Sequence, residues 1–517
     1  MQKILIANRG EIAVRIIRAC RDLGLASVAV FSESDRGARH VRMADEAVAI
    51  GPSPPRESYL RIDTLVEAAR ASGADAVHPG YGFLAENAAF AAACTQAGLT
   101  FIGPTAKAIE LMGSKTAARE AARAAGVPIV PGTLTPLAAE ASDADLAAAA
   151  RKVGYPIMVK AVAGGGGKGM RVVSGAEGLV SAVRAARSEA GSSFGDSAIY
   201  FERQLIRPRH IEVQILADQH GTVLPFVERE CSIQRRHQKV VEETPSMAVP
   251  PRLRQRLTRA AAAVASSVGY TNAGTIEFLV DEQGRYYFLE MNTRLQVEHP
   301  ITELVTGIDL VTWQIRISRG ERLDVAPRDA VTPRGHAIEC RIYAEDPDAG
   351  FLPSPGRVLG LRAPDGPGVR DDSGVEAGSE ISIYYDPLVS KLVVWGASRN
   401  EAIGRMTRAL REYEVSGVRT SLPFFRWMLR EPAFARGEFH TGYLDELLQS
   451  RRGEPFETPE LSDAEVAAMA IALRAASNDA VPAVPVAVTA VRRPVDTGTV
   501  PPRGGWKDTA RREGLRG

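Results

Sequence analysis

The first 112 residues alternate between short apolar runs and segments of helical periodicity, and this alternation constrains the fold more than any other feature. The runs KILIAN, SVAVFS, DAVHPG and TFIGP are typical of buried strands, whereas EIAVRIIRACRDLG and AENAAFAAACTQAG have the spacing of amphipathic helices. This order predicts a doubly wound parallel sheet. The first strand ends in Asn8-Arg9-Gly10-Glu11 without the repeated glycines of a dinucleotide site, which argues against a nicotinamide enzyme.

The remaining patterns predict three further segments, because a chain of 517 residues is too long for one hydrophobic core. Strand patterns such as IEVQIL, TIEFLV and YYFLEMN dominate the second segment. The third begins with the strand-like HAIECRIYA and ends with the helical run EAIGRMTRALREYEV. The last contains an acidic helical stretch and a Pro-, Val- and Ala-rich run typical of an extended linker. We expect mixed α/β and α+β architecture, with domains over residues 1–113, 114–320 and 331–448 and a partly disordered tail over residues 453–517.

Charge and cysteine content narrow the possible functions. The chain has 63 basic and 62 acidic residues, which argues against a nucleic-acid binder that depends on neutralising phosphates. Its four cysteines are far apart and form no CxxC pair, so neither a zinc site nor a disulfide framework is predicted. No run approaches the roughly twenty apolar residues of a membrane span. We expect a soluble cytoplasmic protein that acts on small molecules, with no nucleic-acid or membrane partner.

Four consecutive glycines lie between two strand patterns in MVKAVAGGGGKGMRVV, residues 158–173. Because glycine has no Cβ, such a run lets the backbone approach phosphate oxygens closely. Lys160 and Lys168 flank the glycines, and lysine is a compact charge suited to phosphate. The segment is not a Walker loop, since Lys168 is followed by Gly169 rather than Ser or Thr. A flexible hairpin loop is the alternative interpretation of the glycines alone.

Two glutamates, Glu277 and Glu290, lie in strand patterns joined by a short polar turn, which predicts a β-hairpin. In a register symmetric about Gln283 and Gly284 the two carboxylates are opposite one another, roughly 5 Å apart, and Asn292 is on the same face. Two carboxylates this close need a cation, and this set of oxygen ligands suits magnesium bound to nucleotide phosphates. The alternative is a pair of solvated glutamates on an exposed hairpin.

Two further polar segments are candidates for chemistry. In MNTRLQVEHP, the residues Arg294, Gln296, Val297 and Glu298 offer a cation, an amide, a backbone N–H and a carboxylate, which could bind and deprotonate a small oxyanion. The segment ERECSIQRRHQKVVEE places several basic residues between acidic ones. For both segments, a solvated charged surface remains the alternative interpretation.

Together these motifs resemble the biotin carboxylase branch of the ATP-grasp superfamily. The order NRGEIAVR, HPGYGFLAEN, FIGP, MGSK, GGGGKGM, ERECSIQRRHQKVVEE, EMNTRLQVEHP, GHAIECRIYAEDP and FLPSPG matches from Met1 to about Leu448. The glycine loop and the magnesium hairpin are similar to the wider superfamily, whereas RLQVEHPITE and RGHAIECRIYAEDP resemble the biotin-dependent branch. The resemblance implies a central ATP-grasp domain with a mobile lid at about residues 131–203 and a C-terminal biotin carboxylase domain.

The resemblance also implies a role for individual residues. Those expected to bind ATP are Lys115, Lys160, Gly165, Gly166, Lys168, Glu202, Leu205, His210, Gln234 and His237. Glu277, Glu290 and Asn292 would hold Mg²⁺ or Mn²⁺. Lys239, Arg294, Gln296 and Val297 would bind bicarbonate. Glu298 would be the general base, Arg341 would stabilise the ureido oxygen of biotin, and His299 is interpreted as structural.

The reaction implied is ATP-dependent carboxylation of biotin through carboxyphosphate. None of the ten methionines is followed by lysine, as in biotin-accepting domains, so we expect a separate biotin carboxyl carrier protein and a separate carboxyltransferase. Relatives suggest a homodimer. RIYAEDP, GPGVRDDSGVEAG and IYYDPLVSKLVVWG look like subunits of acyl-CoA carboxylases, with acetyl- or propionyl-CoA as acceptor. The final GGWKDTARREGLRG resembles a segment of some of these subunits, so Trp506 is expected to anchor a partner unless the tail is disordered.

The same motifs allow two other functions. The chain could be another ATP-grasp ligase, such as a purine-pathway carboxylating enzyme or half of a carbamoyl-phosphate synthetase, neither of which needs biotin. It could also be a regulatory nucleotide-binding subunit without catalysis, although the presence of Glu277, Glu290, Arg294, Glu298 and Arg341 argues against that.

Overall fold

The computed structural model describes residues 1–133, 135–138, 140–162, 170–451, 453–457 and 461–478. They fall into two units, Met1–Glu457 and Thr458–Gly517. In the second unit, helix α17 (Leu461–Asn478) coincides with the predicted acidic helical stretch. The predicted residues Gly165, Gly166, Lys168 and Trp506 lie outside the described residues. Within the described ranges, no helix has the length and apolar character needed to cross a membrane.

The N-terminal residues form the predicted doubly wound sheet, whose five parallel strands have the order β3-β2-β1-β4-β5. Helices α1 (Gly10–Asp22) and α11 (Leu310–Ser318) cover one face, and α3 (Ile62–Ala71) and α4 (Ala88–Gln96) cover the other. Successive strand residues point to opposite faces, so Ile4 packs in the first core and Leu5 in the second. The strands are β1 Lys3–Ile6, β2 Ala26–Phe31, β3 Glu46–Ala49, β4 Ala76–His78 and β5 Thr100–Phe101.

One eight-stranded antiparallel sheet contains strands from the second and third predicted segments, in the order β13-β12-β9-β10-β11-β14-β21-β19. The strands are β9 Arg209–Ala217, β10 Val223–Arg235, β11 Gln238–Thr244, β12 Asn272–Val280, β13 Tyr286–Asn292, β14 His336–Tyr343, β19 Val369–Ser373 and β21 Leu388–Gly396. Strand β11 pairs directly with β14, for example at Val241 and Cys340. The second and third predicted domains, residues 114–320 and 331–448, therefore share one continuous sheet.

The two faces of this sheet differ in chemistry. On β9, Ile211 and Val213 pack against α9 (Pro251–Ser267) in an apolar core. The alternate residues His210, Glu212 and Gln214 point to the opposite face and are also buried. Buried charged groups need compensating partners. We therefore expect the functional site on this polar face.

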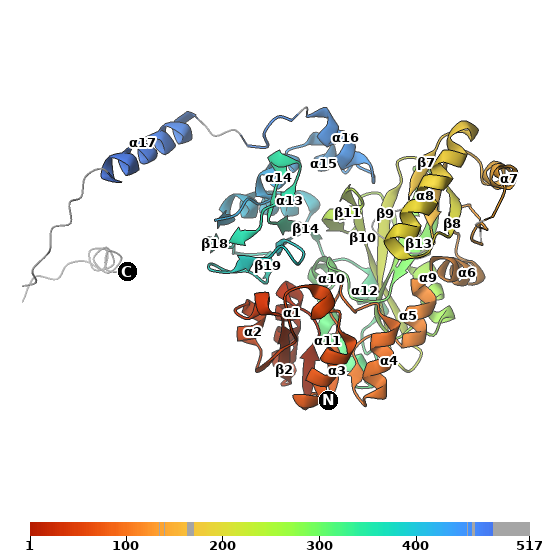
Figure 1. Cartoon of the computed structure of the whole chain (residues 1–517), viewed down its shortest axis with the longest axis horizontal. Coiled ribbons are helices and arrows are strands. Elements are labelled where there is room, and N and C mark those ends of the chain that lie inside the picture. The colour runs from red at the N-terminus through yellow and green to blue at the C-terminus, as the bar shows by residue number, and fades with distance from the viewer. Residues whose placement is uncertain (134, 139, 163–169, 452, 458–460, 479–517) are drawn as a thin grey trace, which may run out of the picture. The chain divides into compact units, whose positions relative to one another are not determined.

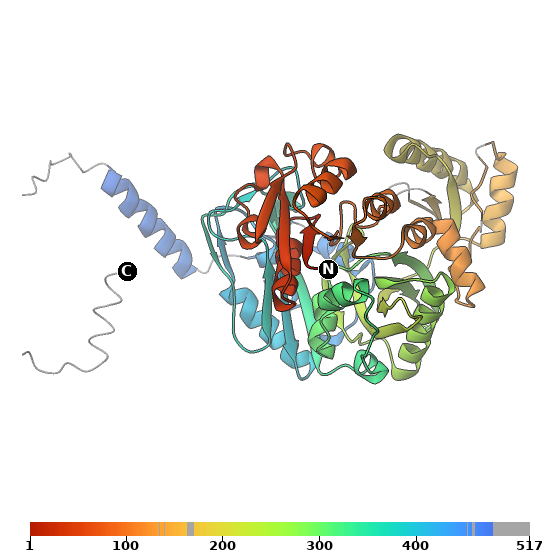
Figure 2. The same cartoon turned by 90° about the horizontal axis from the view of Figure 1, so that it is seen from below.

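A separate three-stranded sheet, β7-β6-β8, lies in the region predicted to be a lid. Its strands are β6 Ile157–Ala161, β7 Arg171–Val173 and β8 Ile199–Arg203, and helices α7 (Asp143–Val153) and α8 (Leu179–Phe194) share its core. Figures 1 and 2 both show these elements together at one end of the first unit. In the sequence, the glycine run falls between β6 and β7.

The C-terminal part of the first unit is α+β, as predicted. Helices α13 (Arg399–Glu412) and α14 (Leu422–Met428) share an apolar core with β14 and β21. Phe456 packs edge-on against Phe424 and Trp427 of α14, so residues near the end of the first unit still contact this core. The remaining elements are α2 Arg39–Met43, α5 Ala106–Gly113, α6 Lys115–Ala124, α10 His299–Thr306, α12 Pro327–Val331, α15 Pro432–Arg436, α16 Tyr443–Ser450, β15 Glu345–Asp346, β16 Leu352–Pro353, β17 Gly356–Arg357, β18 Gly360–Arg362, β20 Glu380–Ile381 and β22 Glu414–Ser416, with short 3-10 turns at Glu33–Asp35, Pro55–Glu57, Ala176–Gly178 and Pro347–Ala349.

His78, at the end of β4, is buried in its neutral form. Its Nδ1 accepts a hydrogen bond from the Gly80 N–H at 3.1 Å, and burial lowers the pKa of His78 to about 3. The unfolded chain takes up this proton near pH 6.5, so stability should fall by up to about 1.4 kcal/mol for each pH unit below that value until the folded pKa is reached. We expect His78→Gln to weaken the dependence of the thermal unfolding midpoint on pH between pH 6.5 and 4. An unchanged dependence would contradict this account.

Candidate active site

Lys239 of β11 is at the centre of a cluster of carboxylates on the polar face of the large sheet. Its Nζ donates to Glu212 at 2.5 Å, to Glu277 at 2.8 Å and to Glu298 at 2.7 Å. These glutamates come from β9, from β12 and from the residue before α10. Burial opposes the charged form, but the carboxylates raise the pKa of Lys239 well above its usual value. The carboxylates therefore favour the charged form of Lys239.

Glu298 lies between two cations. Its side chain is 0% exposed, one oxygen accepts from Lys239, and the other accepts from Arg341 at 3.0 Å. Arg341 also donates from Nε to Glu242 at 2.7 Å. Burial would raise the pKa of Glu298, but the two cations hold that pKa well below its usual range. Glu298 is thus ionised, which is the form that a general base requires.

The loop between β13 and α10 is bonded to the same cluster. Arg294 donates to Glu86 at 2.9 Å and to the side-chain oxygen of Gln296 at 2.9 Å. Gln296 Nε2 donates to Glu277 at 3.2 Å. The donors of Arg294, Gln296 and Lys239 therefore surround one region, and such a set can hold a small oxyanion.

The β12–β13 hairpin pairs Glu277 with Glu290, as predicted, although by a different register near the turn. Phe278 pairs with Phe288, one position away from the symmetric register. A bulge leaves Leu289 without a partner in the ladder and restores the predicted pairing at the glutamates. Asn292 donates from its amide to Glu277 at 2.9 Å, so all three predicted metal ligands are brought together.

The donor set of this hairpin fits a divalent cation. Glu277 is buried and Glu290 half-buried, so the alternative of two solvated glutamates on an exposed hairpin is wrong. Burial raises the pKa of Glu290, and repulsion by the nearby Glu277 carboxylate raises it further. A cation between them would relieve this repulsion, and carboxylate and amide oxygens suit Mg²⁺.

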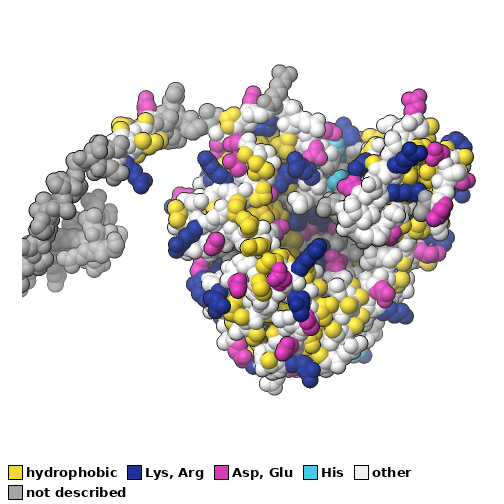
Figure 3. Space-filling model, viewed as in Figure 1, with side chains coloured by type: hydrophobic (Ala, Val, Ile, Leu, Met, Phe, Trp, Pro, Cys, Tyr) yellow, Lys and Arg dark blue, Asp and Glu magenta, His cyan; other side chains and the backbone are white. Residues whose placement is uncertain are grey.

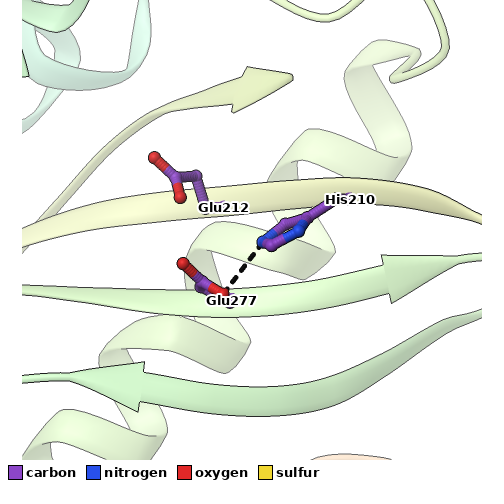
Figure 4. Close-up of side chains that lie close together, drawn as sticks. All are labelled: His210, Glu212 and Glu277. Carbon is purple, nitrogen blue, oxygen red and sulfur yellow. Dashed lines mark ion pairs between the residues drawn. The ribbon is translucent and has the colours of Figure 1, made fainter. Parts of the chain in front are cut away.

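His210 and Glu212 of β9 form a second group with Glu277 of β12. One ligand atom of each lies within 4.8 Å of the others. Figure 4 shows the His210 ring directed at Glu277, with Nε2 and Oε2 2.9 Å apart. Burial opposes protonation, but Glu277 raises the pKa of His210. Glu212 was not among the predicted site residues, although the polar alternation of His210, Glu212 and Gln214 on a strand with an apolar opposite face could have indicated it.

The predicted nucleotide-binding residues on the small sheet are held by ion pairs. Lys160 of β6 and Arg119 of α6 both pair with Glu202 of β8. Lys115 is the first residue of α6, where burial lowers its pKa and Glu290 opposes that shift. Arg119 was not among the predicted site residues. Its position four residues after Lys115, and so on the same face of one helix, could have indicated it.

The other predicted nucleotide-binding residues lie around the β8–β9 connection and the β10–β11 turn. Gln234 donates from Nε2 to Nδ1 of His210 at 2.7 Å. Leu205 is half-buried in the connection, and His237 is exposed in the turn. Both Arg236 and His237 adopt a positive φ there, of 49° and 66°.

The charged segment ERECSIQRRHQKVVEE forms the β10–β11 hairpin, so its interpretation as a solvated charged face is wrong for most of its length. Arg229, for example, is fully buried and donates to Glu212 at 2.5 Å and to Thr302 at 2.8 Å. The space-filling view shows a hollow in one face of this unit with basic, acidic and histidine side chains around it (Figure 3). The arrangement can bind anions and move a proton at one ionised carboxylate.

Three family models match the chain. They are "Biotin carboxylase, N-terminal domain" over residues 1–109, "Carbamoyl-phosphate synthase L chain, ATP binding domain" over residues 114–326 and "Biotin carboxylase C-terminal domain" over residues 339–446. Together they follow the order of the three predicted domains.

Known proteins similar to this chain include the biotin carboxylase of Nostoc sp., which is 52% identical over 86% of this chain and 99% of its own length. One of the pyruvate carboxylase subunits of Methanothermobacter thermautotrophicus is 53% identical over 87% of this chain and 90% of its own length.

Among solved structures, the beta-gamma-ATP complex of Campylobacter jejuni biotin carboxylase superimposes with a TM-score of 0.83 and 43% identity, over 86% of this chain and 98% of the other. The biotin carboxylase domain dimer of Hydrogenobacter thermophilus 2-oxoglutarate carboxylase, in complex with MgADP, ADP and bicarbonate, also has a TM-score of 0.83, with 45% identity over 89% of this chain and 99% of the other. The chain therefore belongs to the biotin carboxylase family of ATP-binding ligases.

Proposed function

We propose that this enzyme uses ATP and bicarbonate to carboxylate biotin on a separate carrier protein, in the first half-reaction of an acyl-CoA carboxylase. The observation that carries the proposal is the position of Glu298 between Lys239 and Arg341, with Arg294 bonded into the same cluster through Gln296. The Hydrogenobacter relative was solved with MgADP and bicarbonate, which supports these substrates. That relative is a dimer, and we propose a homodimer here too.

Bicarbonate is a poor electrophile, so it must be activated before it can react with biotin. Lys239, Arg294, Gln296 and the Val297 N–H would hold the anion, and Glu298 would take its proton. The deprotonated oxygen can then attack the γ-phosphorus of ATP, which gives carboxyphosphate and ADP. Mg²⁺ held by Glu277, Glu290 and Asn292 would balance the charge of the phosphates. Lys115, Lys160 and His210 would orient the nucleotide, with Glu202 and Leu205 at the adenine and Gln234 and His237 beside it.

Biotin must become a nucleophile in the second step. Carboxyphosphate releases CO2 and phosphate, and that phosphate takes the proton from the ureido nitrogen, which then attacks CO2. The guanidinium of Arg341 would balance the oxyanion that develops on the ureido oxygen. Water must be excluded, because carboxyphosphate would otherwise hydrolyse. We propose that residues 131–203, with the small sheet and helices α7 and α8, close over ATP for this purpose.

The acceptor of the carboxyl group is proposed to be an acyl-CoA such as acetyl- or propionyl-CoA. The motifs RIYAEDP and IYYDPLVSKLVVWG support this choice. Similar proteins include the pyruvate carboxylase relative described above and the methylcrotonoyl-CoA carboxylase α-chain of rice, which is 49% identical over 60% of its own length. The test is to purify the enzyme with its partners and to measure incorporation of labelled bicarbonate into acetyl-CoA, propionyl-CoA, methylcrotonoyl-CoA and pyruvate. Labelling of pyruvate alone would contradict the proposal.

Free biotin should stimulate bicarbonate-dependent release of phosphate from ATP, and Arg341→Ala should abolish that stimulation. Arg341 also donates to Glu298, so the turnover without biotin should fall in the variant as well, but it should remain measurable. The measurement is phosphate release with and without bicarbonate and biotin, for both proteins. The variant leaves both Glu242 and Glu298 without one of their partners, so its thermal unfolding should be recorded as a control.

Two outcomes would contradict the proposed function. Turnover of ATP in the wild type that is indifferent to biotin would indicate another ATP-grasp ligase. A wild type that binds ATP without turnover, even with its partners present, would indicate a regulatory subunit.

A further inference from the structure

Lys391 of β21 is a fully buried cation that none of the steps above uses. Its side chain is 0% exposed. The Nζ donates to the carbonyl oxygen of Val297 at 2.9 Å and lies 3.1 Å from Glu11 Oε1. A buried ammonium requires compensation, which one carboxylate can supply. Charge compensation by Glu11 therefore does not explain why Lys391 also bonds to the Val297 carbonyl.

This bond holds the peptide that joins two residues of the proposed bicarbonate site. The Val297 carbonyl belongs to the peptide unit whose nitrogen is that of Glu298, so fixing this oxygen fixes the backbone from which the Glu298 side chain extends. Strand pairing explains the geometry, because Lys391 pairs with Arg341 across β21 and β14. Residues directly opposite in an antiparallel pair have side chains on the same face. Arg341 thus holds the carboxylate of Glu298, while Lys391 holds the backbone beside it.

We propose that Lys391 is a positioning residue for the bicarbonate site, acting through the backbone of Val297 and Glu298. The inference rests on the proposed roles of those two residues. Lys391 itself contacts no reacting atom in this account; it sets the distance and direction of Val297 and Glu298 relative to Lys239. The neighbouring carbonyl of Gln296 is held in a similar way, because His299 donates to it from Nδ1 at 2.8 Å. Two buried side chains therefore fix consecutive carbonyls of this loop.

The partner of Lys391 gives a function to the N-terminal motif Asn8-Arg9-Gly10-Glu11, which the reaction did not otherwise use. Glu11 is buried in the first turn of α1, and its carboxylate reaches Lys391 from the N-terminal sheet domain. The backbone just after β19 lies close to the start of α1 at this point. A Cβ on Gly374 would be only 2.5 Å from the Glu11 amide nitrogen. Glu11 therefore supports the loop indirectly, through its ion pair with the cation that holds the loop.

The test compares three variants with the wild type: Lys391→Met, the double variant Lys391→Met/Glu11→Gln, and Arg399→Met as a matched control. Arg399 is also a buried cation, paired with Glu243 at 2.9 Å and bonded to the Phe434 carbonyl, away from the loop. The readouts are KM for bicarbonate, KM for ATP, kcat and thermal unfolding. The double variant removes both charges of this ion pair, and the nearby Asp372 keeps its own pair with Arg370, so the variant should fold even where Lys391→Met is unstable.

Both variants that lack Lys391 should raise KM for bicarbonate by about tenfold, the loss expected for one charge-assisted hydrogen bond, with KM for ATP changed by less than about twofold. Arg399→Met should lower thermal stability without raising KM for bicarbonate. A KM for bicarbonate that returns to the wild-type value in the double variant would overturn the inference, because Lys391 would then act only through charge balance. An equal rise in Arg399→Met would overturn it too. These outcomes differ from a failure of the proposed function, because in that case the wild type itself would show no bicarbonate-dependent turnover.

Discussion

Glu298→Gln is expected to lower the kcat of bicarbonate-dependent phosphate release by a factor of about 10² to 10⁴, the usual contribution of a general base. Glutamine has nearly the same size, and its oxygen can still accept a hydrogen bond from Lys239 or Arg341. It cannot take up the proton of bicarbonate. The loss should therefore appear in kcat at saturating bicarbonate, while the protein remains folded and retains ATP binding.

Glu212→Gln is the matched control for this substitution. Glu212 accepts from the same Lys239, at 2.5 Å, and is equally buried, but its other partner is Arg229 rather than Arg341. We expect its kcat to fall by less than about tenfold, because it orients Lys239 and takes no proton. If both variants lost activity to the same degree, the carboxylate cluster would act as a unit and Glu298 could not be assigned as the base.

Features that depend on local patterning could be predicted from the sequence. The alternation of apolar runs and helices in the first 112 residues specifies the parallel sheet, because each strand and helix needs only its own periodicity to be recognised. The pairing of Glu277 with Glu290 followed from hairpin geometry alone. The predicted pair was correct, but the predicted register near the turn was wrong by one residue. The sequence pattern gives no indication of the bulge at Leu289.

Features that depend on long-range pairing could not be predicted. Glu212, Arg229 and Glu242 belong to the site because β9, β10 and β11 are neighbours in one sheet, and strand order is not readable from periodicity. For the segment around Arg229, the mixture of charges along the chain left a solvated face as an alternative interpretation. In the fold, Arg229 is instead compensated by Glu212 on an adjacent strand and Thr302 on α10. A buried network of this kind has no local pattern that distinguishes it from a charged surface.

Lys239→Met should have the largest effect on stability, because Lys239 is bonded to three glutamates at once. Its Nζ lies 2.5 to 2.8 Å from Glu212, Glu277 and Glu298. Removing one partner of a buried ion pair costs about 3–5 kcal/mol, because it leaves an uncompensated charge. Here methionine would leave three carboxylates close together, and turnover should fall with stability because the bicarbonate cradle loses its ammonium. Thermal unfolding at neutral pH and phosphate release measure the two losses.

The dependence of this loss on pH identifies its cause. In the wild type, Lys239 lowers the pKa of both Glu277 and Glu298. Without it those pKa values rise, so the folded variant takes up protons as the pH falls, and the stability gap to the wild type should narrow from pH 8 to pH 5.5. Mg²⁺ should raise the unfolding midpoint of the variant more than that of the wild type, since a cation can replace part of the missing charge. A gap that is constant with pH and insensitive to Mg²⁺ would instead attribute the loss to packing of the lysine side chain.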